Sequence, residues 1–189
     1  MNIKSTLIVV TISALLASVT AWAANDGTVG STSTGDLDIT LTMPDLVRIS
    51  GFTDIPISYV AGSGNTGVTE GTDDLCVYRN AAGGAFAITA TGDGGTLNGG
   101  TAGSGGTAFE VANTVAAAAY TVTFTDGAPT DITLTTGNQN TTALGAHETD
   151  PTCAGSTNTS VKVTFQNSVL AALPSGTYDG RLTLTVAPQ

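Results

Sequence analysis

Hydrophobic and polar residues alternate strictly in several short stretches of this chain. The most regular is GDLDITLTMP, where every second position is apolar until Pro44 ends the pattern. The apolar positions are Leu37, Ile39, Leu41 and Met43. Because side chains of a β-strand alternate between its two faces, this period of two predicts a strand with one apolar face.

The same alternation recurs farther along the chain, between stretches rich in Gly, Asn, Asp and Thr. It is clear at residues 86–90, 120–124 and 161–165, and again in the C-terminal stretch GTYDGRLTLTV. The C-terminal face consists of Tyr178, Gly180, Leu182, Leu184 and Val186. Shorter candidate strands are residues 46–50, 55–59, 75–79, 108–111 and 132–135.

Helical spacing is absent from the sequence pattern. The alanine-rich stretch 111–119 lies between two candidate strands, so we expect at most one helical turn there. About ten short strands separated by glycine-rich turns predict an all-β, antiparallel β-sandwich.

The first 23 residues have the pattern of a secretory signal peptide. Lys4 precedes an apolar stretch, and Ala21-Trp22-Ala23 is a small-x-small cleavage site. The apolar stretch is shorter than the roughly 20 residues that a spanning helix needs. We therefore expect an exported protein with a flexible, polar leader at residues 24–35, the strand at 36–44 and a sandwich domain at 45–189.

The charge balance of the chain excludes nucleic acid as a partner. Without Lys4, four basic residues remain against 15 acidic ones. Nucleic-acid phosphates require a basic surface, which this composition does not supply.

Two cysteines, Cys76 and Cys153, lie in the exported part of the chain. In an oxidising compartment an even pair most simply forms one disulfide. The bond would link the strand near Cys76 to the loop before residue 161, and would stabilise the fold by roughly 4 kcal/mol. Two isolated thiols do not make a tetrahedral metal site.

Residues able to carry catalysis or metal binding are scarce. His147 has Glu148 and Asp150 beside it, but no G-x-S-x-G nucleophile motif occurs, and we expect a solvated loop histidine. The pairs Asp73-Asp74 and Asp36-x-Asp38 lack the spacing of a calcium loop, so we expect solvated acids.

The glycine-rich block at residues 91–106 lacks the following helix that a phosphate-binding loop needs, and we expect a flexible surface loop. The sequence therefore favours a protein that is not an enzyme and holds no cofactor.

In its organisation the chain resembles the subunits of chaperone–usher fimbriae, particularly the archaic (spore coat protein U-like) and class 5-type pilins. The resemblance rests on the signal peptide, the alternating strand near the mature N-terminus, the Thr/Gly/Ala-rich sandwich and the terminal pattern SGTYDGRLTLTV. It covers the exported chain in organisation and its two ends in motif.

The resemblance implies an immunoglobulin-like sandwich that lacks one strand and is completed by the N-terminal strand of another subunit. Leu37, Ile39, Leu41 and Met43 would then be the donor residues. Tyr178, Leu182, Leu184 and Val186 would border the acceptor groove and bind a periplasmic chaperone before assembly at an outer-membrane usher. The product would be a homopolymeric filament on the cell surface.

Two other readings stay open from the residues. In the first, residues 37–43 pair within their own domain, as the edge strand of a self-complete secreted sandwich that acts as an adhesin or binding module. In the second, distant carboxylates meet in the fold and the chain is an enzyme.

Overall fold

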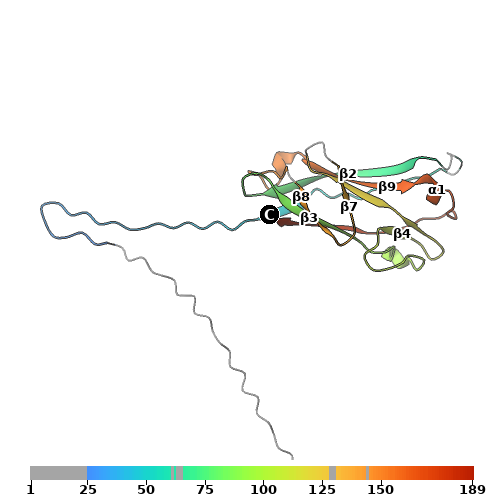
Figure 1. Cartoon of the computed structure of the whole chain (residues 1–189), viewed down its shortest axis with the longest axis horizontal. Helices are drawn as coiled ribbons and strands as arrows, with labels where there is room; N and C mark the ends of the chain where they lie inside the picture. The colour runs from blue at the N-terminus through green and yellow to red at the C-terminus, as the bar shows by residue number, and fades with distance from the viewer. Residues whose placement is uncertain (1–24, 61, 63–65, 128–130, 144) are drawn as a thin grey trace, which may run out of the picture. The chain divides into compact units, whose positions relative to one another are not determined.

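The computed structural model describes residues 25–60, 62, 66–127, 131–143 and 145–189 (Figure 1). The predicted signal peptide lies outside the described residues. The chain divides into two units, residues 1–43 and residues 44–189, and each is treated by itself below.

Strands dominate the second unit. They are β1 (Val47–Ser50), β2 (Val68–Arg79), β3 (Phe86–Gly92), β4 (Glu110–Ala112), β5 (Ala117–Ala119), β6 (Thr121–Thr125), β7 (Asp131–Leu134), β8 (Gln139–Ala143), β9 (Thr159–Gln166) and β10 (Leu182–Pro188). Helical structure is limited to α1 (Asn167–Leu170) and the short 3₁₀ turns η1 (Leu97–Gly99) and η2 (Cys153–Gly155).

The strands form two main antiparallel sheets. One has the order β1-β2-β9-β6-β7, the other has the order β10-β3-β8, and β4 and β5 form a small separate ribbon. The prediction of an all-β sandwich is therefore confirmed.

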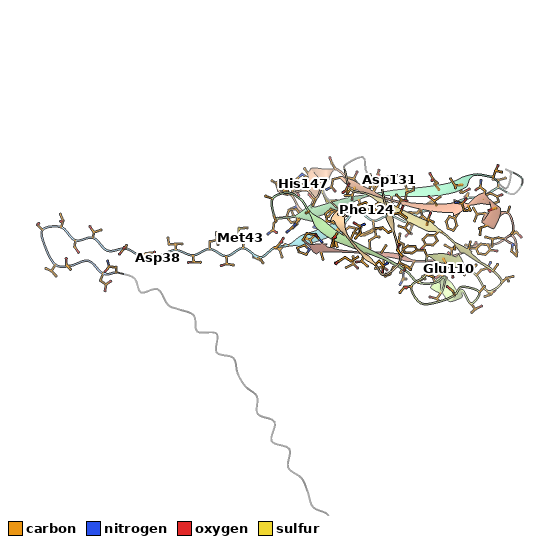
Figure 2. All side chains as sticks on the ribbon, viewed as in Figure 1. Asp38, Met43, Glu110, Phe124, Asp131 and His147 are labelled. Atoms are coloured by element: carbon orange, nitrogen blue, oxygen red, sulfur yellow. A yellow bond between two sulfur atoms is a disulfide. The ribbon has the colours of Figure 1, made fainter. Side chains whose placement is uncertain are left out.

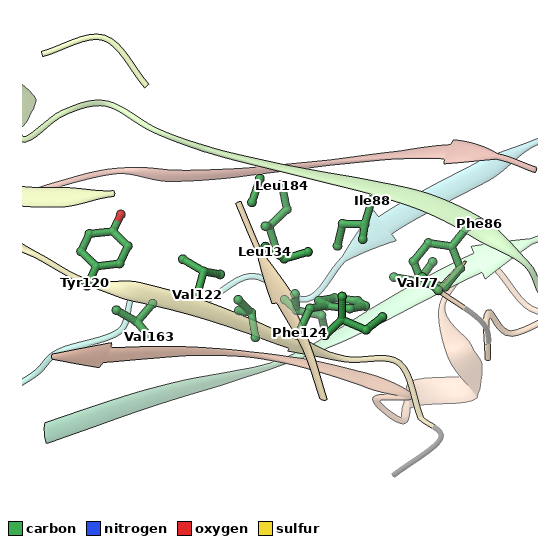
Figure 3. Packing of buried hydrophobic residues seen from close by; sticks show 14 of the residues in the cluster. Val77, Phe86, Ile88, Tyr120, Val122, Phe124, Leu134, Val163 and Leu184 are labelled. Atoms are coloured by element: carbon green, nitrogen blue, oxygen red, sulfur yellow. The ribbon is translucent and has the colours of Figure 1, made fainter. Parts of the chain in front are cut away.

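A single hydrophobic core lies between the sheets. Phe86 and Phe124 meet edge to face, with ring centroids 6.1 Å apart. Figure 3 shows Val122, Leu134 and Leu184 in the same layer, with Tyr120 at one end of it. The alternating residues of β3, β6 and β9 point into this core, as their period of two predicts.

The strand bounds differ from the sequence prediction at several places. β2 begins at Val68, seven residues before the predicted start, because it pairs with β9 from Val68↔Gln166 onward. The polar strand β8 and the alanine strand β5 were not predicted, since neither has an alternating apolar face. Residues 55–59 form no strand, and β10 begins at Leu182 rather than near Tyr178.

The predicted disulfide between Cys76 and Cys153 is present. As expected, it joins β2 to the segment before β9, through the turn η2. Within the part of the chain that the structure describes, no helix is long and apolar enough to cross a bilayer.

The glycine-rich block is folded tightly against itself, contrary to the expectation of a flexible loop. Gly94 accepts a hydrogen bond from the main-chain nitrogen of Gly105, at 3.1 Å, and donates one to Ala108. A Cβ atom at Gly94 would lie 2.1 Å from the Gly105 carbonyl oxygen, and the residue has φ +62°. Glycine is needed here both for the close approach and for the left-handed backbone.

Candidate functional site

The N-terminal segment, residues 37–43, exposes its whole apolar face. The exposed fractions are 68% for Leu37, 87% for Ile39, 83% for Leu41 and 71% for Met43. No strand pairing is assigned to these residues, and Figure 2 shows side chains projecting along this extended stretch between the labelled Asp38 and Met43. An apolar face of this kind, left in water, is typical of a segment that binds elsewhere.

A short main-chain bridge precedes the N-terminal segment. Asn25 and Asp36 exchange two hydrogen bonds, with N to O distances of 2.9 and 3.0 Å. Residues 25–36 thus close into a loop in which Asn25 meets Asp36. The flexible leader was predicted at residues 24–35, and its described part lies in this loop.

The sandwich domain has an open groove of about 830 Å³. Part of its lining comes from the extended stretch of residues 52–59, called the lip here, which follows β1. Another part comes from residues 176–184, which include the first half of β10. The lining therefore includes residues of β10, an edge strand of one sheet, and of the segment that follows β1, an edge strand of the other sheet.

The floor of the groove is the hydrophobic core itself. Val161, Val163 and Phe165 of β9 line the groove and belong to the core cluster, as do Tyr120 and Leu184. These side chains are only 3–8% exposed, so the groove reaches the edge of the core without opening it to solvent.

β10 is an edge strand on the groove side. Among the described strands it pairs with β3 alone, in register from Leu182↔Gly92 to Pro188↔Phe86. Leu182 and Leu184 of this strand line the groove, and a further strand could continue the ladder along its second edge.

From the sequence, Tyr178, Leu182, Leu184 and Val186 are expected to lie beside an acceptor groove. Tyr178, Leu182 and Leu184 line the groove, whereas Val186 packs on the core beyond it. The Tyr178 hydroxyl donates a 2.8 Å hydrogen bond to the Pro174 carbonyl oxygen, which holds the chain just before β10.

The lip is attached to β2 by a buried carboxylate. Asp73 is 6% exposed and accepts hydrogen bonds from the main-chain nitrogen of Thr53, at 3.0 Å, and from its hydroxyl, at 2.5 Å. The expectation that Asp73 is a solvated acid is therefore wrong. The sequence did not reveal this role because Thr53 is 20 residues away from Asp73.

Tyr120, which lines the groove, belongs to a group of three aromatic residues. Its ring stacks on Phe109 with centroids 5.7 Å apart and lies 5.4 Å from Phe165. Burial, together with the negative charge of Asp93, raises the pKa of Tyr120 to about 12. The phenol is therefore neutral over the whole physiological range.

Sequence reasoning also missed the role of Arg79, at the end of β2. It is 6% exposed, and its guanidinium binds both carboxylate oxygens of Asp45 at 3.2 and 2.7 Å. This hydrogen bonding, more than the attraction of the charges, holds the pKa of Asp45 below its usual range. Arg79 lies at the end of a predicted strand, and its partner Asp45 is 34 positions away in the sequence. No local pattern therefore indicates this ion pair.

His147 lies away from the groove lining and is only partly solvated. Its main chain is hydrogen-bonded to β2. The His147 nitrogen donates to the Val77 carbonyl oxygen, and the His147 carbonyl oxygen accepts from the Arg79 nitrogen. Its Nδ1 accepts a 3.0 Å hydrogen bond from the Asp150 nitrogen. Among the described residues no group of three His, Cys, Asp or Glu side chains is placed to hold a metal ion.

Comparison with known proteins gave one structural match of low similarity. No protein-family model and no curated protein sequence matches the chain. A solved chain from a chaperone–tip adhesin complex, described as vital for synergistic activation of CFA/I fimbriae biogenesis, aligns with a TM-score of 0.46 and 16% identity. The alignment covers 76% of this chain and 42% of that one, so this chain spans less than half of its length. A match at this level carries no functional conclusion.

Proposed function

We propose that this protein is the structural subunit of a bacterial surface filament, a pilus or fimbria. Residues 37–43 of one copy would add as a strand to the groove of a second copy and complete an immunoglobulin-like sandwich. The observation that carries this proposal is the presence, in one chain, of an exposed segment with alternating apolar residues and of a groove lined in part by core residues.

The N-terminal segment and β10 are matched in length. Each has seven residues, Leu37–Met43 and Leu182–Pro188, which corresponds to about 23 Å of extended strand. Main-chain hydrogen bonds along β10 would supply affinity, and the alternating side chains would fix the register by entering the groove.

The direction of insertion follows from where the ends of the domain lie. Arg79 binds both Asp45 and the main-chain oxygen of Gln189, so the start of the domain and the end of β10 lie together. A strand added antiparallel to β10 would place its own Met43 at the opposite end, near Leu182. Each copy would then carry its donor at one end and receive one at the other, which generates an open filament rather than a closed ring.

The apolar contribution is large enough for a stable junction. Burial of four side chains at roughly 2 kcal/mol each gives on the order of 8 kcal/mol before the cost of ordering the segment. The ladder hydrogen bonds would add to this value.

Assembly partners and location follow from the same proposal. An edge strand beside a groove needs protection before assembly, which a periplasmic chaperone would give by binding along β10. An outer-membrane usher would then release the subunits to the cell surface. The protein would have a structural rather than a catalytic role.

The test is electron microscopy of material sheared from cells that produce the protein, with gels of heated and unheated samples. We expect thin filaments and a ladder of oligomers that collapses to monomer only on boiling. Leu41→Arg should abolish both, because it places a charge in the apolar groove. Thr40→Arg, on the opposite face of the same strand, is the matched control and should still assemble.

Deletion of Asp36–Met43 distinguishes the proposal from a self-complete sandwich. A filament subunit should stay folded without these residues and fail to polymerise, whereas a self-complete domain would lose an edge strand and much of its stability. Filaments that survive Leu41→Arg as well as Thr40→Arg would contradict the donor assignment.

A further inference from the structure

Arg79 links three separate parts of the sandwich domain. Its side chain is 7% exposed, and its guanidinium forms the two-pronged contact with Asp45 described above. The same group donates hydrogen bonds to the main-chain oxygens of Ala85, just before β3, and of Gln189, just after β10. Because its donors point to three segments, the side chain cannot turn without breaking contacts on all of them.

The neighbouring residue reinforces the same attachment. Asn80 accepts a hydrogen bond from the Leu46 nitrogen through its side-chain oxygen, at 2.7 Å, and its Nδ2 donates to the Pro44 carbonyl, at 2.7 Å. Its main-chain nitrogen donates to the Leu46 carbonyl, at 3.2 Å. The first three residues of the domain, 44–46, are thus bound by the last residue of β2 and the residue after it.

This attachment lies where tension would enter the domain. In the proposed filament residues 37–43 are held inside one copy, so a pull along the fibre reaches the next copy at Pro44. Past that point β1 offers only four residue pairs with β2, Val47↔Arg79 to Ser50↔Cys76. A short edge strand pulled at its end separates one pair at a time, which gives little resistance.

We propose that Asp45, Arg79 and the main-chain oxygen of Gln189, called the clamp here, transmit tension from the N-terminal segment directly to β10. This inference rests on the proposed function, because β10 is the strand along which the next copy's donor would lie. Force would then pass from donor to Asp45, through Arg79 to the end of β10, and into the following donor. The core and β1 would be bypassed.

The chemistry suits that task. A guanidinium and a carboxylate joined by two parallel hydrogen bonds form one of the stronger polar contacts in proteins, and it has a fixed direction. Lysine would keep the charge but has neither the planar fork nor the number of donors needed to hold three segments together.

The experiment compares filaments of the full chain under load and at rest. Wild type, Asp45→Ala and Arg79→Lys are imaged before and after a fixed shear treatment, and melting temperatures of the unsheared filaments are recorded. Asp74→Asn, which removes an exposed carboxylate on β2, is the matched control. Asp45→Asn, which keeps the size of the side chain, replaces Asp45→Ala if that variant fails to fold.

We expect both clamp variants to form filaments of normal length before shear. After shear, their mean length should be about twofold or more below that of wild type, because the paired hydrogen bonds between Arg79 and Asp45 are lost. The control should break as wild type does. Equal lengths after shear in all variants would overturn the clamp. The clamp would also be overturned if the variants lost melting temperature and unsheared filament length in proportion to their loss of sheared length. That pattern would indicate that Asp45 and Arg79 only stabilise the fold. Absence of filaments from wild type would instead contradict the proposed function.

Discussion

The side chain of Ile55 lies directly over Gly71, in the space where β2 has no Cβ atom. A Cβ built at Gly71 would lie 2.3 Å from Cγ2 of Ile55 and 2.9 Å from Cγ1 of Ile57. Gly71 lies in a regular strand with an ordinary backbone angle. Glycine is needed here because it has no side chain to collide with Ile55 and Ile57. The lip of the groove is therefore seated on β2 by close packing as well as by the Asp73 carboxylate.

Gly71→Ala should displace the lip. The added methyl group forces Ile55 outward, and we expect the free energy of unfolding to fall by about 1–3 kcal/mol, as for other overpacked positions. Urea unfolding of the folded subunit measures this change. Thr72→Ala, at the exposed neighbouring position, should leave the free energy nearly unchanged. Adding Ile55→Ala to Gly71→Ala should cost less than the sum of the single changes; full additivity would contradict the packing argument.

Alkaline pH should destabilise the domain through Tyr120. The pKa of this phenol is raised to about 12 in the folded protein, against 10.0 ordinarily, so the unfolded chain loses its proton first. The contribution of Tyr120 to stability is then complete below pH 10 and is lost as the pH rises toward 12. Unfolding measured across this range should show the decline in wild type and a smaller one in Tyr120→Phe. Tyr178→Phe, which alters a groove tyrosine outside the aromatic stack, should retain the wild-type decline.

Asn158 should be a costly position to change. Its side-chain oxygen accepts from the Val77 nitrogen at 2.9 Å, and its Nδ2 donates to the carbonyls of Val77 and Gly145 at 2.9 and 2.7 Å. Asn158→Ala leaves these main-chain groups without their partner, and we expect a loss of about 2–3 kcal/mol. Thermal or chemical unfolding checks this. Gln139→Ala, at an exposed position, is the control. If Asn158→Ala lowers the free energy of unfolding no more than this control does, water replaces all three hydrogen bonds.

Removal of the disulfide should weaken the whole domain. Cys76 and Cys153 are 77 positions apart, so the bond restricts a long loop of the unfolded chain. Replacing both by Ser should lower the free energy of unfolding by about 4 kcal/mol on the chain-entropy model. The comparison is made in denaturant without reductant; reductant should bring wild type to the level of the double variant and leave that variant unchanged.

The alternation of apolar residues determined much of this fold from the sequence alone. It indicated the core faces of β3, β6 and β9, because a period of two places every second side chain on one face of a sheet. The cysteine pairing also followed from sequence, since only two thiols were available. The apolar face of residues 37–43 was equally visible there, and so was the absence of obvious catalytic motifs.

Tertiary structure decided the features that depend on partners distant in the chain. β8 has a polar sequence and becomes a strand because it pairs with β3, whereas residues 55–59 have a strand pattern but are not assigned to a strand. The buried contact of Asp73 with Thr53, and the attachment of Asp45 and Gln189 to Arg79, join segments that local sequence cannot relate. The sequence of one chain shows which residues are apolar, but only the fold shows that Leu37, Ile39, Leu41 and Met43 stay exposed while the apolar residues of β9 are buried.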